Sequence, residues 1–374
     1  MKGRNKMKKT RVLILFGGCS TEYEVSLQSA YSVLSNINKE KYELILLGIT
    51  KSGQWFRYLG SIEKIKNNTW WTDPYDCISI FISPNRGIPK LLEYEKDHMK
   101  EVLFDIVFPI LHGKNGEDGT IQGIFEQAGI PVVGCSTLSS ALCMDKNRAH
   151  KLVSSEGIRV PSSKVFSGVI TEEEILYHIK NFYYPLFVKP VRAGSSFGIT
   201  KVYDRDELIG AMKTAFLHDS EVIVEEEIPG FEVGCAVLGN EGLVIGEIDE
   251  IELSEGFFDY TEKYTLKNSK IHMPARLDKK TKLRLKDTAA IIYKTLGCSG
   301  FARVDMFLTP EKEIVFNEVN TIPGFTSHSR YPNMMKGIGI EFGELIDILI
   351  SLGFENERNN VKKIKSPQRA LNFS

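Results

Sequence analysis

The sequence predicts a multidomain α/β protein in which an open, largely parallel sheet comes first and hairpins follow. Its 374 residues exceed the usual length of one domain, and a hydrophobic content of 42% is sufficient for several packed cores. The first part contains four short apolar runs, RVLILF, YELILLGI, FDIVFPI and IPVVG, separated by helical or polar segments. This alternation is typical of strands that helices connect in an open, largely parallel sheet.

A glycine turn follows the first apolar run. Gly17 and Gly18 end this run, and apolar residues at helical spacing begin at Val25. The glycines are therefore expected in a turn between a strand and a helix, whose N-terminus can receive an anion or a carboxylate. The turn matches neither the dinucleotide-binding GxGxxG pattern nor a Walker A sequence, so it does not predict a P-loop.

The pattern changes after Met144, where a lysine lies inside an apolar strand. Lys189 belongs to the run PLFVKP, and the loop RAGSSFG connects this run to a second strand, ITKVY. A glycine and serine loop between two strands predicts a hairpin whose backbone N–H groups and hydroxyls can donate to phosphates. A mobile surface hairpin is the alternative, but a buried ammonium without a partner is costly, which favours a binding site. Asp204 then caps a helix, and EVIVEEEI is a strand that ends in three carboxylates.

A second hairpin, with a turn at Pro310, carries a predicted metal site. Its strands RVDMFL and EIVFNEVN place Arg303 with Asp305, and Glu318 with Asn320, on shared faces, because side chains two apart point the same way. Carboxylate and amide oxygens are the hard ligands that suit Mg²⁺ when it also holds phosphates. The alternative interpretation is that these polar residues lie on a solvated hairpin edge. It is less favoured, because they interrupt apolar runs.

Charge and composition exclude several classes of partner. The formal net charge is −1, so no overall field favours nucleic acid or a membrane surface. No apolar window has the length of a membrane span, and the basic N-terminus is not followed by a signal-peptide core. The six cysteines show no CxxC pairing. They are expected to be free thiols in a reducing cytoplasm.

The order of motifs resembles the D-alanine:D-alanine ligase family of the ATP-grasp fold, over roughly residues 11–352. The motifs are FGGCSTEYEVS, LHGKNGEDG, MDKNRA, VKPVRAGSSFG, the acidic strand end, FFDYTEKY, ARVDMF and NEVNTIPGFTSHS. The ending TSHSRYP is similar to that of the D-alanine:D-serine ligases of vancomycin resistance, VanG type. The resemblance implies an N-terminal Rossmann-like substrate domain (1–134), a central ATP-grasp subdomain with a phosphate lid (135–223), a C-terminal ATP-grasp subdomain (224–355) and a polar tail (356–374).

The resemblance also implies a reaction and its partners. The carboxylate of D-alanine attacks the γ-phosphate of ATP, and the amine of D-serine then attacks the acyl phosphate. ATP and two Mg²⁺ ions are expected, Mn²⁺ can substitute, and the enzyme is expected to be a homodimer. A product that ends in D-serine would serve altered peptidoglycan precursors and vancomycin resistance. The alternatives are a housekeeping D-alanine:D-alanine ligase and another ATP-grasp carboxylate–amine ligase.

Individual residues match the functional positions of this family. Those expected in catalysis are Glu22, Ser195, Tyr264, Arg303 and the backbone of Gly324. Those expected to bind substrate are His112, Ser329 and Arg330. Those expected to bind ATP are Lys146, Lys189, Ser196, Glu225, Glu227, Ile228, Glu232 and Lys263. Those expected to bind metal are Asp305, Glu318 and Asn320.

Two positions need separate interpretation. Glu226 stands where many relatives have a lysine, so the lysine contact to adenine is not expected here. Arg330 stands where ligases that form D-alanyl-D-alanine usually have an apolar residue, and its donors are expected to bind the serine hydroxyl. The alternative is that Arg330 pairs with Asp249 or Glu250. The segment 253–271 has no sustained period and predicts a long loop that closes over the site.

Overall fold

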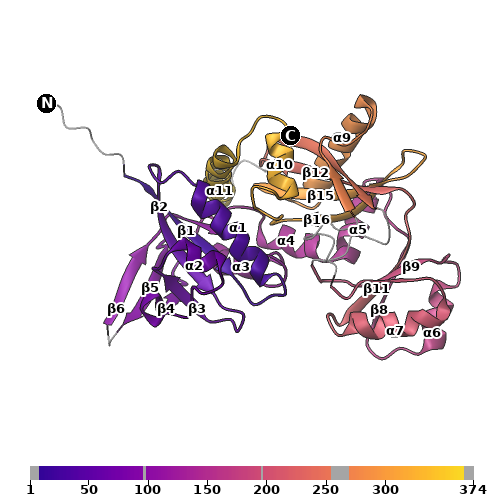
Figure 1. Cartoon of the computed structure of the whole chain (residues 1–374), viewed down its shortest axis with the longest axis horizontal. Helices are drawn as coiled ribbons and strands as arrows, with labels where there is room; N and C mark the ends of the chain where they lie inside the picture. Colours follow the sequence, from indigo (N-terminus) through magenta and orange to yellow (C-terminus); the bar gives the residue numbers. More distant parts are fainter. Residues whose placement is uncertain (1–7, 96–97, 195–196, 254–268, 366–374) are drawn as a thin grey trace, which may run out of the picture.

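The computed structural model describes residues 8–95, 98–194, 197–253 and 269–365, and these residues form three sheets. Figure 1 shows the first sheet at one end of the molecule and the other two at the opposite end. The helices α4 (Thr137–Met144) and α5 (Lys146–Ser155) lie between the two ends. The three sheets follow one another along the chain, in the order that the sequence predicts.

The first sheet has seven strands in the order β6-β5-β4-β3-β2-β1-β7. Its strands are β1 (Thr10–Gly17), β2 (Tyr42–Ile49), β3 (Trp55–Tyr58), β4 (Cys77–Ile82), β5 (Lys90–Glu95), β6 (His98–Leu103) and β7 (Ile106–Pro109). Its helices are α1 (Tyr23–Asn36), α2 (Ile62–Lys66), η1 (Pro74–Asp76) and α3 (Thr120–Gln127). As predicted, the glycine turn connects β1 to α1.

The prediction of a largely parallel first sheet is wrong for its outer half. Only β1 pairs in parallel, with β2 and β7, whereas β2 to β6 pair in antiparallel fashion. Parallel pairing needs a long crossover, usually a helix, and the turns after β2, β4 and β5 are too short for one. The run IPVVG also forms no strand, because only Val132 bridges to Val107.

The second sheet has the order β10-β9-β11-β8 and is antiparallel throughout. Its strands are β8 (Ser163–Ser167), β9 (Leu186–Pro190), β10 (Thr200–Val202) and β11 (Glu221–Glu226), and its helices are α6 (Glu172–Ile179) and α7 (Arg205–Phe216). The predicted hairpin around the glycine and serine loop is confirmed as β9-β10. The predicted cap is confirmed too, since Asp204 accepts from the N–H groups of Asp206 and Glu207.

The third sheet has the order β14-β13-β12-β15-β16. Its strands are β12 (Phe231–Leu238), β13 (Val244–Leu253), β14 (Ser269–His272), β15 (Phe301–Leu308) and β16 (Ile314–Asn320), with helices α9 (Lys279–Thr295) and α10 (Arg330–Lys336). The predicted second hairpin is confirmed. Asp305 faces Glu318 and Arg303 faces Asn320 across β15 and β16, with a bulge after Asp305.

The end of the chain packs back onto its beginning. Helix α11 (Phe342–Lys365) contacts α1 and β7, and Leu345 and Leu349 share one buried cluster with Phe16 and Phe108. The first and third parts of the chain therefore hold one another in place. The predicted polar tail is partly helical, because residues 356–365 continue α11. Their glutamate, arginine and lysine residues favour helix.

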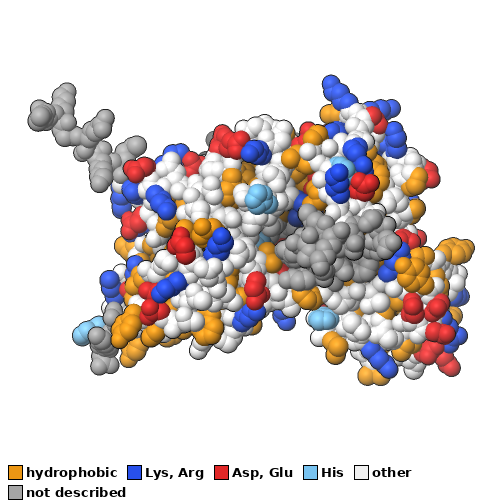
Figure 2. All heavy atoms as spheres, in the orientation of Figure 1, with side chains coloured by type: hydrophobic (Ala, Val, Ile, Leu, Met, Phe, Trp, Pro, Cys, Tyr) orange, Lys and Arg blue, Asp and Glu red, His pale blue; other side chains and the backbone are white. Residues whose placement is uncertain are grey.

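The surface carries mixed charge. Figure 2 shows acidic and basic side chains interspersed on the face that it presents. Among the described residues, no helix is both long and apolar enough to span a bilayer.

Candidate functional site

A cleft between the second and third sheets adjoins a smaller polar pocket. The cleft has about 1000 Å³ of empty space, open to solvent. Its lining includes most of the residues predicted to bind ATP: Lys146, Lys189, Glu225, Glu227, Ile228 and Glu232. The smaller pocket is lined by Glu22, Glu117, Gly194, Asn320 and others. Lys146 and Glu318 line both spaces, so a molecule in one would meet a molecule in the other at these two residues.

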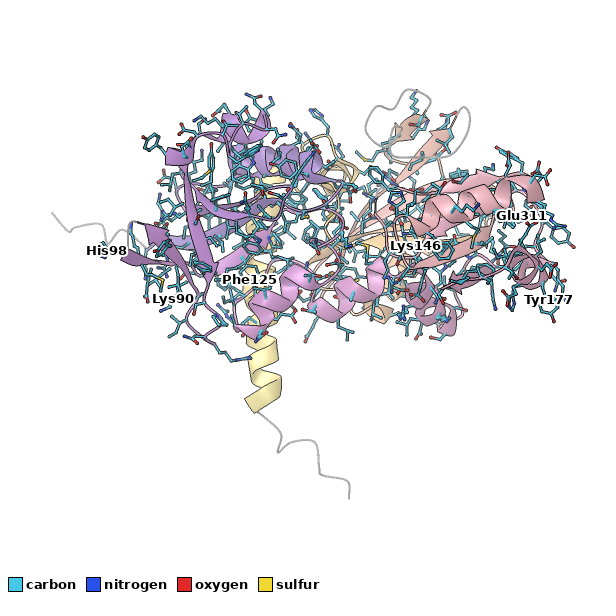
Figure 3. All side chains as sticks on the ribbon, turned by 90° about the horizontal axis from the view of Figure 1, so that it is seen from below. Lys90, His98, Phe125, Lys146, Tyr177 and Glu311 are labelled. Atoms are coloured by element: carbon cyan, nitrogen blue, oxygen red, sulfur yellow. The ribbon has the colours of Figure 1, made fainter. Side chains whose placement is uncertain are left out.

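Lys146 is positioned by the start of α5. The side chain of Asp145 accepts from the backbone N–H of Arg148 at 2.9 Å, which caps the helix and fixes where it begins. Nζ of Lys146 then lies 3.4 Å from Oε2 of Glu318 and donates to the carbonyl oxygen of Ala193 at 3.1 Å. Figure 3 shows Lys146 close to the middle of the molecule. The ammonium therefore connects the base of the glycine loop to the third sheet.

A buried ion pair forms the floor of the cleft. Nζ of Lys189 lies 2.6 Å from Oε2 of Glu225, and Glu225 is only 1% exposed. Burial raises the pKa of Glu225, but the charges of Lys189 and His150 outweigh it, so the pKa is lowered. Oε1 of Glu225 and Nδ1 of His150 lie 3.7 Å apart, and neither atom has a hydrogen-bond partner among the described residues. Oε1 of Glu225 is therefore buried beside His150, while Oε2 holds Lys189.

Two residues near the cleft, His150 and Lys201, were not predicted from the sequence. His150 lies one helical turn beyond Lys146, and its Nε2 lies 2.8 Å from the carbonyl oxygen of Asn317. Lys201 faces Phe187 across the lid hairpin and pairs with Glu227 at 2.6 Å. Helical spacing from Lys146 would have indicated His150. The hairpin register would have placed Lys201 beside Phe187, which lines the cleft.

The residue at the expected adenine-lysine position also lines the cleft. Oε1 of Glu226 accepts from the backbone N–H of Ser162 at 3.0 Å, and it lies 3.6 Å from Arg159. Its carboxylate therefore joins β11 to the segment before β8. The neighbouring Glu227 forms an ion pair with Lys201 at 2.6 Å.

The residues predicted to bind metal lie together at one end of the hairpin. Arg303 donates to Asp305 through Nε at 2.8 Å and Nη2 at 2.7 Å, and Nδ2 of Asn320 donates to Asp305 at 2.9 Å. The two carboxylates and the amide oxygen are ligand types that Mg²⁺ accepts, so the donor set fits this ion. Within the described part of the chain, no three His, Cys, Asp or Glu side chains form a complete metal site. Phosphate and water would supply the remaining ligands.

Glu22 lies where the first part of the chain meets the glycine and serine loop between β9 and β10. A Cβ added at Gly113 would lie 2.3 Å from Oε2 of Glu22, and one added at Gly194 would lie 2.8 Å from it. Both glycines therefore allow their backbones to approach the carboxylate closely. Glu22 is buried, and it follows the glycine turn immediately before α1. The turn at Gly17 and Gly18 therefore positions the Glu22 carboxylate at the small pocket.

His112 connects the first and third parts of the chain. Its Nε2 lies 2.9 Å from Oγ of Ser29 and its Nδ1 lies 2.9 Å from the carbonyl oxygen of Ile322. Burial lowers the pKa of His112, but the hydrogen bond and charge of Glu117, with the charge of Glu22, outweigh it and raise the pKa. The folded state therefore binds this proton more tightly than the unfolded chain does.

This raised pKa predicts a pH-dependent contribution to stability. A histidine whose pKa is raised on folding stabilises fully below its unfolded value of about 6.5, and this contribution is lost as pH rises through the folded pKa. We expect His112→Gln to lower the free energy of unfolding more at about pH 6 than at about pH 9. Urea unfolding at both values measures this difference. Glu117→Gln should remove the pH dependence, and an equal loss at both pH values would contradict the assignment.

The segment after β16 contains the residues predicted to bind the second substrate. Oγ of Ser329 accepts from the backbone N–H of Thr326 at 3.0 Å and lies 2.8 Å from the hydroxyl of Thr326. A Cβ at Gly324 would lie 3.1 Å from Oγ of Ser329, so the two residues are close neighbours. This places the Gly324 backbone beside the start of α10.

Arg330 is engaged by carboxylates, as the alternative interpretation expects. Its Nε and Nη2 donate to the two oxygens of Asp249 at 2.7 and 2.8 Å, and its Nη1 donates to Glu232 at 3.0 Å. The expectation that its donors serve a serine hydroxyl is not favoured, because three of its nitrogen atoms already donate to the carboxylates of Asp249 and Glu232. Glu250, the other partner considered, pairs with Arg276 instead.

Four predicted site residues lie outside the described residues: Ser195, Ser196, Lys263 and Tyr264. The predicted long loop, apart from its ends, also lies there. Its last residues belong to β14, which pairs with β13. The roles of these four residues stay predictions.

The chain matches known proteins over most of its length. The family model described as D-ala D-ala ligase N-terminus matches residues 11–135, and the model described as D-ala D-ala ligase C-terminus matches residues 152–351. The chain is 45% identical to a D-alanine–D-alanine ligase of Caldicellulosiruptor bescii, covering 96% of this chain and 99% of that protein. It is 46% identical to the vancomycin/teicoplanin A-type resistance protein VanA of Enterococcus faecium, covering 93% and 100%.

Solved structures are similar over nearly the whole chain. The VanG D-Ala:D-Ser ligase from Enterococcus faecalis is 62% identical, with a TM-score of 0.86, covering 92% of this chain and 100% of that one. A D-alanine–D-alanine ligase from Bacillus anthracis complexed with ATP is 29% identical, with a TM-score of 0.69, covering 94% and 99%.

Proposed function

Because the chain belongs to the D-alanine:D-alanine ligase family and has its ATP-grasp fold, we propose that it joins D-alanine to D-serine at the expense of ATP. The observation that carries this proposal is that Lys146 and Glu318 line both the cleft and the smaller pocket. ATP in the cleft would direct its γ-phosphate towards an amino acid in the pocket. The γ-phosphate of ATP and the carboxylate of the amino acid would then be held next to each other in the orientation needed for reaction. Such positioning supplies much of the catalysis of phosphoryl transfer.

Nucleotide binding follows from the chemistry of the cleft. Phe187, Ile199 and Phe307 provide apolar lining for a purine. Glu225 would act at the cleft by holding Lys189, with which it forms an ion pair at 2.6 Å. Glu232 also lines the cleft and would bind the ribose hydroxyls, and Lys146 and Lys189 would offset phosphate charge. Bound Mg²⁺, held by Asp305, Glu318 and Asn320, would neutralise phosphate oxygens and so favour attack by an anion.

The proposed reaction has two steps. An oxygen of the D-alanine carboxylate forms a bond to the γ-phosphorus, and the bond from this phosphorus to the β–γ bridging oxygen breaks, which releases ADP. The amine of the second amino acid then bonds to the carbonyl carbon of D-alanyl phosphate, loses a proton, and expels phosphate. Arg303 and the N–H of Gly324 would donate to the oxyanion of the tetrahedral intermediate. The backbone position of Gly324 beside Ser329 is consistent with the carboxylate of the second substrate lying there.

Two second substrates need to be compared. D-serine is supported by the 62% identity with the VanG D-Ala:D-Ser ligase. D-alanine is supported by the Caldicellulosiruptor bescii relative and by Arg330, whose guanidinium is held by Asp249. A product ending in D-serine would serve altered cell-wall precursors and vancomycin resistance. We also infer a cytoplasmic homodimer, and light scattering of the purified protein tests its mass.

A competition experiment tests the proposed function. The protein is incubated with ATP, Mg²⁺, D-alanine and an equal concentration of D-serine, and the dipeptides are measured by mass spectrometry with ADP release in parallel. We expect D-alanyl-D-serine to exceed D-alanyl-D-alanine, because the ligase with 62% identity forms it. Excess D-alanyl-D-alanine would establish the second candidate. ADP release without either dipeptide would reject the ligase.

A further inference from the structure

The connection from the second sheet to the third begins at Glu227, and a lysine of the edge strand β10 holds this residue. β11 ends at Glu226 and β12 begins at Phe231, so residues 227–230 lead from one sheet to the other. Nζ of Lys201 on β10 donates to Oε1 of Glu227 at 2.6 Å. β9 lies between β10 and β11. The lysine therefore reaches past a whole strand to the connection between the sheets.

Lys201 crosses β9 beside an aromatic ring. Lys201 faces Phe187 of β9, and Phe187 faces Glu225 of β11. Residues in register across a sheet point to the same face, and both Phe187 and Glu225 line the cleft. Nζ of Lys201 lies 5.7 Å from the centre of the Phe187 ring, within the range of a cation–π interaction. Lys201 is therefore directed across the cleft face of the hairpin, towards Glu227.

A solvated edge position is the alternative interpretation of Lys201, because lysines on edge strands keep sheets from pairing with one another. A lysine with only this role would extend its ammonium into water. The Lys201 side chain is 16% exposed, whereas that of its partner Glu227 is 36% exposed. The low exposure and the ion pair together favour a role on the cleft side of the sheet.

The ion pair joins two segments that both line the cleft. Phe187 and Ile199 belong to the β9–β10 hairpin, and Ile228 belongs to the connection 227–230. Lys201 lies two residues after Ile199, and Glu227 lies directly before Ile228. The pair is thus next to the apolar residues that would hold a purine. Lys201 is not itself part of the described cleft lining, so it would act through Glu227.

We propose that Lys201 is a positioning residue for the nucleotide base, which holds the β9–β10 hairpin against the connection 227–230 through its ion pair with Glu227. The identity of the nucleotide rests on the proposed function. A flat ring contacts both segments only when their spacing suits it, and a spacing fixed in advance reduces the ordering that binding requires. The pair should therefore affect the affinity for the nucleotide and leave the chemical step unchanged.

Three variants separate positioning from a simple effect of charge. Lys201→Met removes the ammonium, Glu227→Lys reverses the carboxylate, and the double variant Lys201→Glu with Glu227→Lys exchanges the two charges. If Lys201 only attracted an anionic nucleotide, Glu227→Lys would bind it more tightly than the wild type does. If the pair positions the two segments, both single variants lose affinity, and exchanging the charges restores it.

ADP affinity is measured by calorimetry, and circular dichroism confirms that each protein is folded. We expect the affinity to fall by about 5-fold in both single variants, the scale of one partly exposed ion pair, and to return to within about 2-fold of the wild type in the double variant. The KM for ATP should rise with unchanged kcat. Arg205→Met is the matched control, because it breaks an ion pair with Glu172 in the same part of the chain, and neither residue lines the cleft. It should bind ADP like the wild type.

The outcomes separate the inference from the proposed function. Tighter ADP binding by Glu227→Lys, or an equal loss in Arg205→Met, would overturn the positioning role of Lys201. A double variant that binds as weakly as Lys201→Met would also overturn it and show that the ammonium contacts the nucleotide itself. A wild-type protein that binds ADP but forms no dipeptide would reject the proposed ligase and leave the binding test of Lys201 intact. A wild-type protein that binds no ADP would overturn both.

Discussion

Replacing Arg303 with methionine is expected to slow dipeptide formation by about 10²- to 10³-fold, the usual cost of removing one donor to an oxyanion. Arg303 is the proposed side-chain donor to the tetrahedral intermediate, and its guanidinium is 9% exposed. The same side chain also holds Asp305 through two hydrogen bonds. Methionine removes a positively charged partner of the buried Asp305 carboxylate. We therefore also expect a loss of about 3–5 kcal/mol in the free energy of unfolding. Saturation kinetics and urea unfolding measure the two effects.

A double variant separates the catalytic loss from the structural one. In Arg303→Met with Asp305→Asn, the buried pair is neutral, and much of the stability should return. The rate should not return, because methionine has no donor for the oxyanion and asparagine replaces a carboxylate that is proposed to bind Mg²⁺. Arg303→Lys keeps the charge without the planar fork and should show an intermediate rate. A double variant that recovered the rate with the stability would show that Arg303 acts only by supporting the fold.

Local patterns that need only neighbouring residues were predictable from the sequence. The hairpin of β15 and β16 follows from side-chain alternation on both sides of one turn, and alternation fixes which residues share a face. The cap at Asp204 and the lid hairpin follow from short-range preferences of the same kind. The candidate metal residues could therefore be brought together before any tertiary contact was known.

Features that depend on distant partners were not predictable in the same way. Arg330 has its partners on β12 and β13, about a quarter of the chain away, and no local pattern reveals that Gly234 leaves room for a guanidinium. The outer strands of the first sheet have the apolar runs of any strand, and their antiparallel direction depends on connection length. The packing of α11 against β7 likewise depends on a core whose residues come from distant parts of the chain.

Replacing Lys146 with methionine is expected to lower the rate of phosphoryl transfer by about 10³-fold, the scale reported for losing one cation at a transferring phosphoryl group. Lys146 is the cation that lines both the cleft and the small pocket, 3.4 Å from Glu318. Methionine keeps most of the apolar stem but offers no charge to the γ-phosphate. The Lys146 side chain is 8% exposed and that of Glu318 is 22% exposed, so losing this partly buried ion pair should also lower the free energy of unfolding, which urea unfolding measures. Rapid-quench single-turnover assays of ADP formation measure the chemical step.

The ADP affinity of Lys146→Met shows whether the variant loses nucleotide binding or only phosphoryl transfer. Lys189, Glu225 and the apolar lining remain, so ADP should bind to Lys146→Met within a few-fold of the wild-type affinity, while ADP formation from ATP fails. Lys90→Met is a matched control, since Lys90 also forms an ion pair but lies at the far end of the first sheet from Lys146 (Figure 3). Its rate should equal that of the wild type. If Lys146→Met lost ADP affinity and transfer in the same proportion, Lys146 would be a binding residue for the nucleotide.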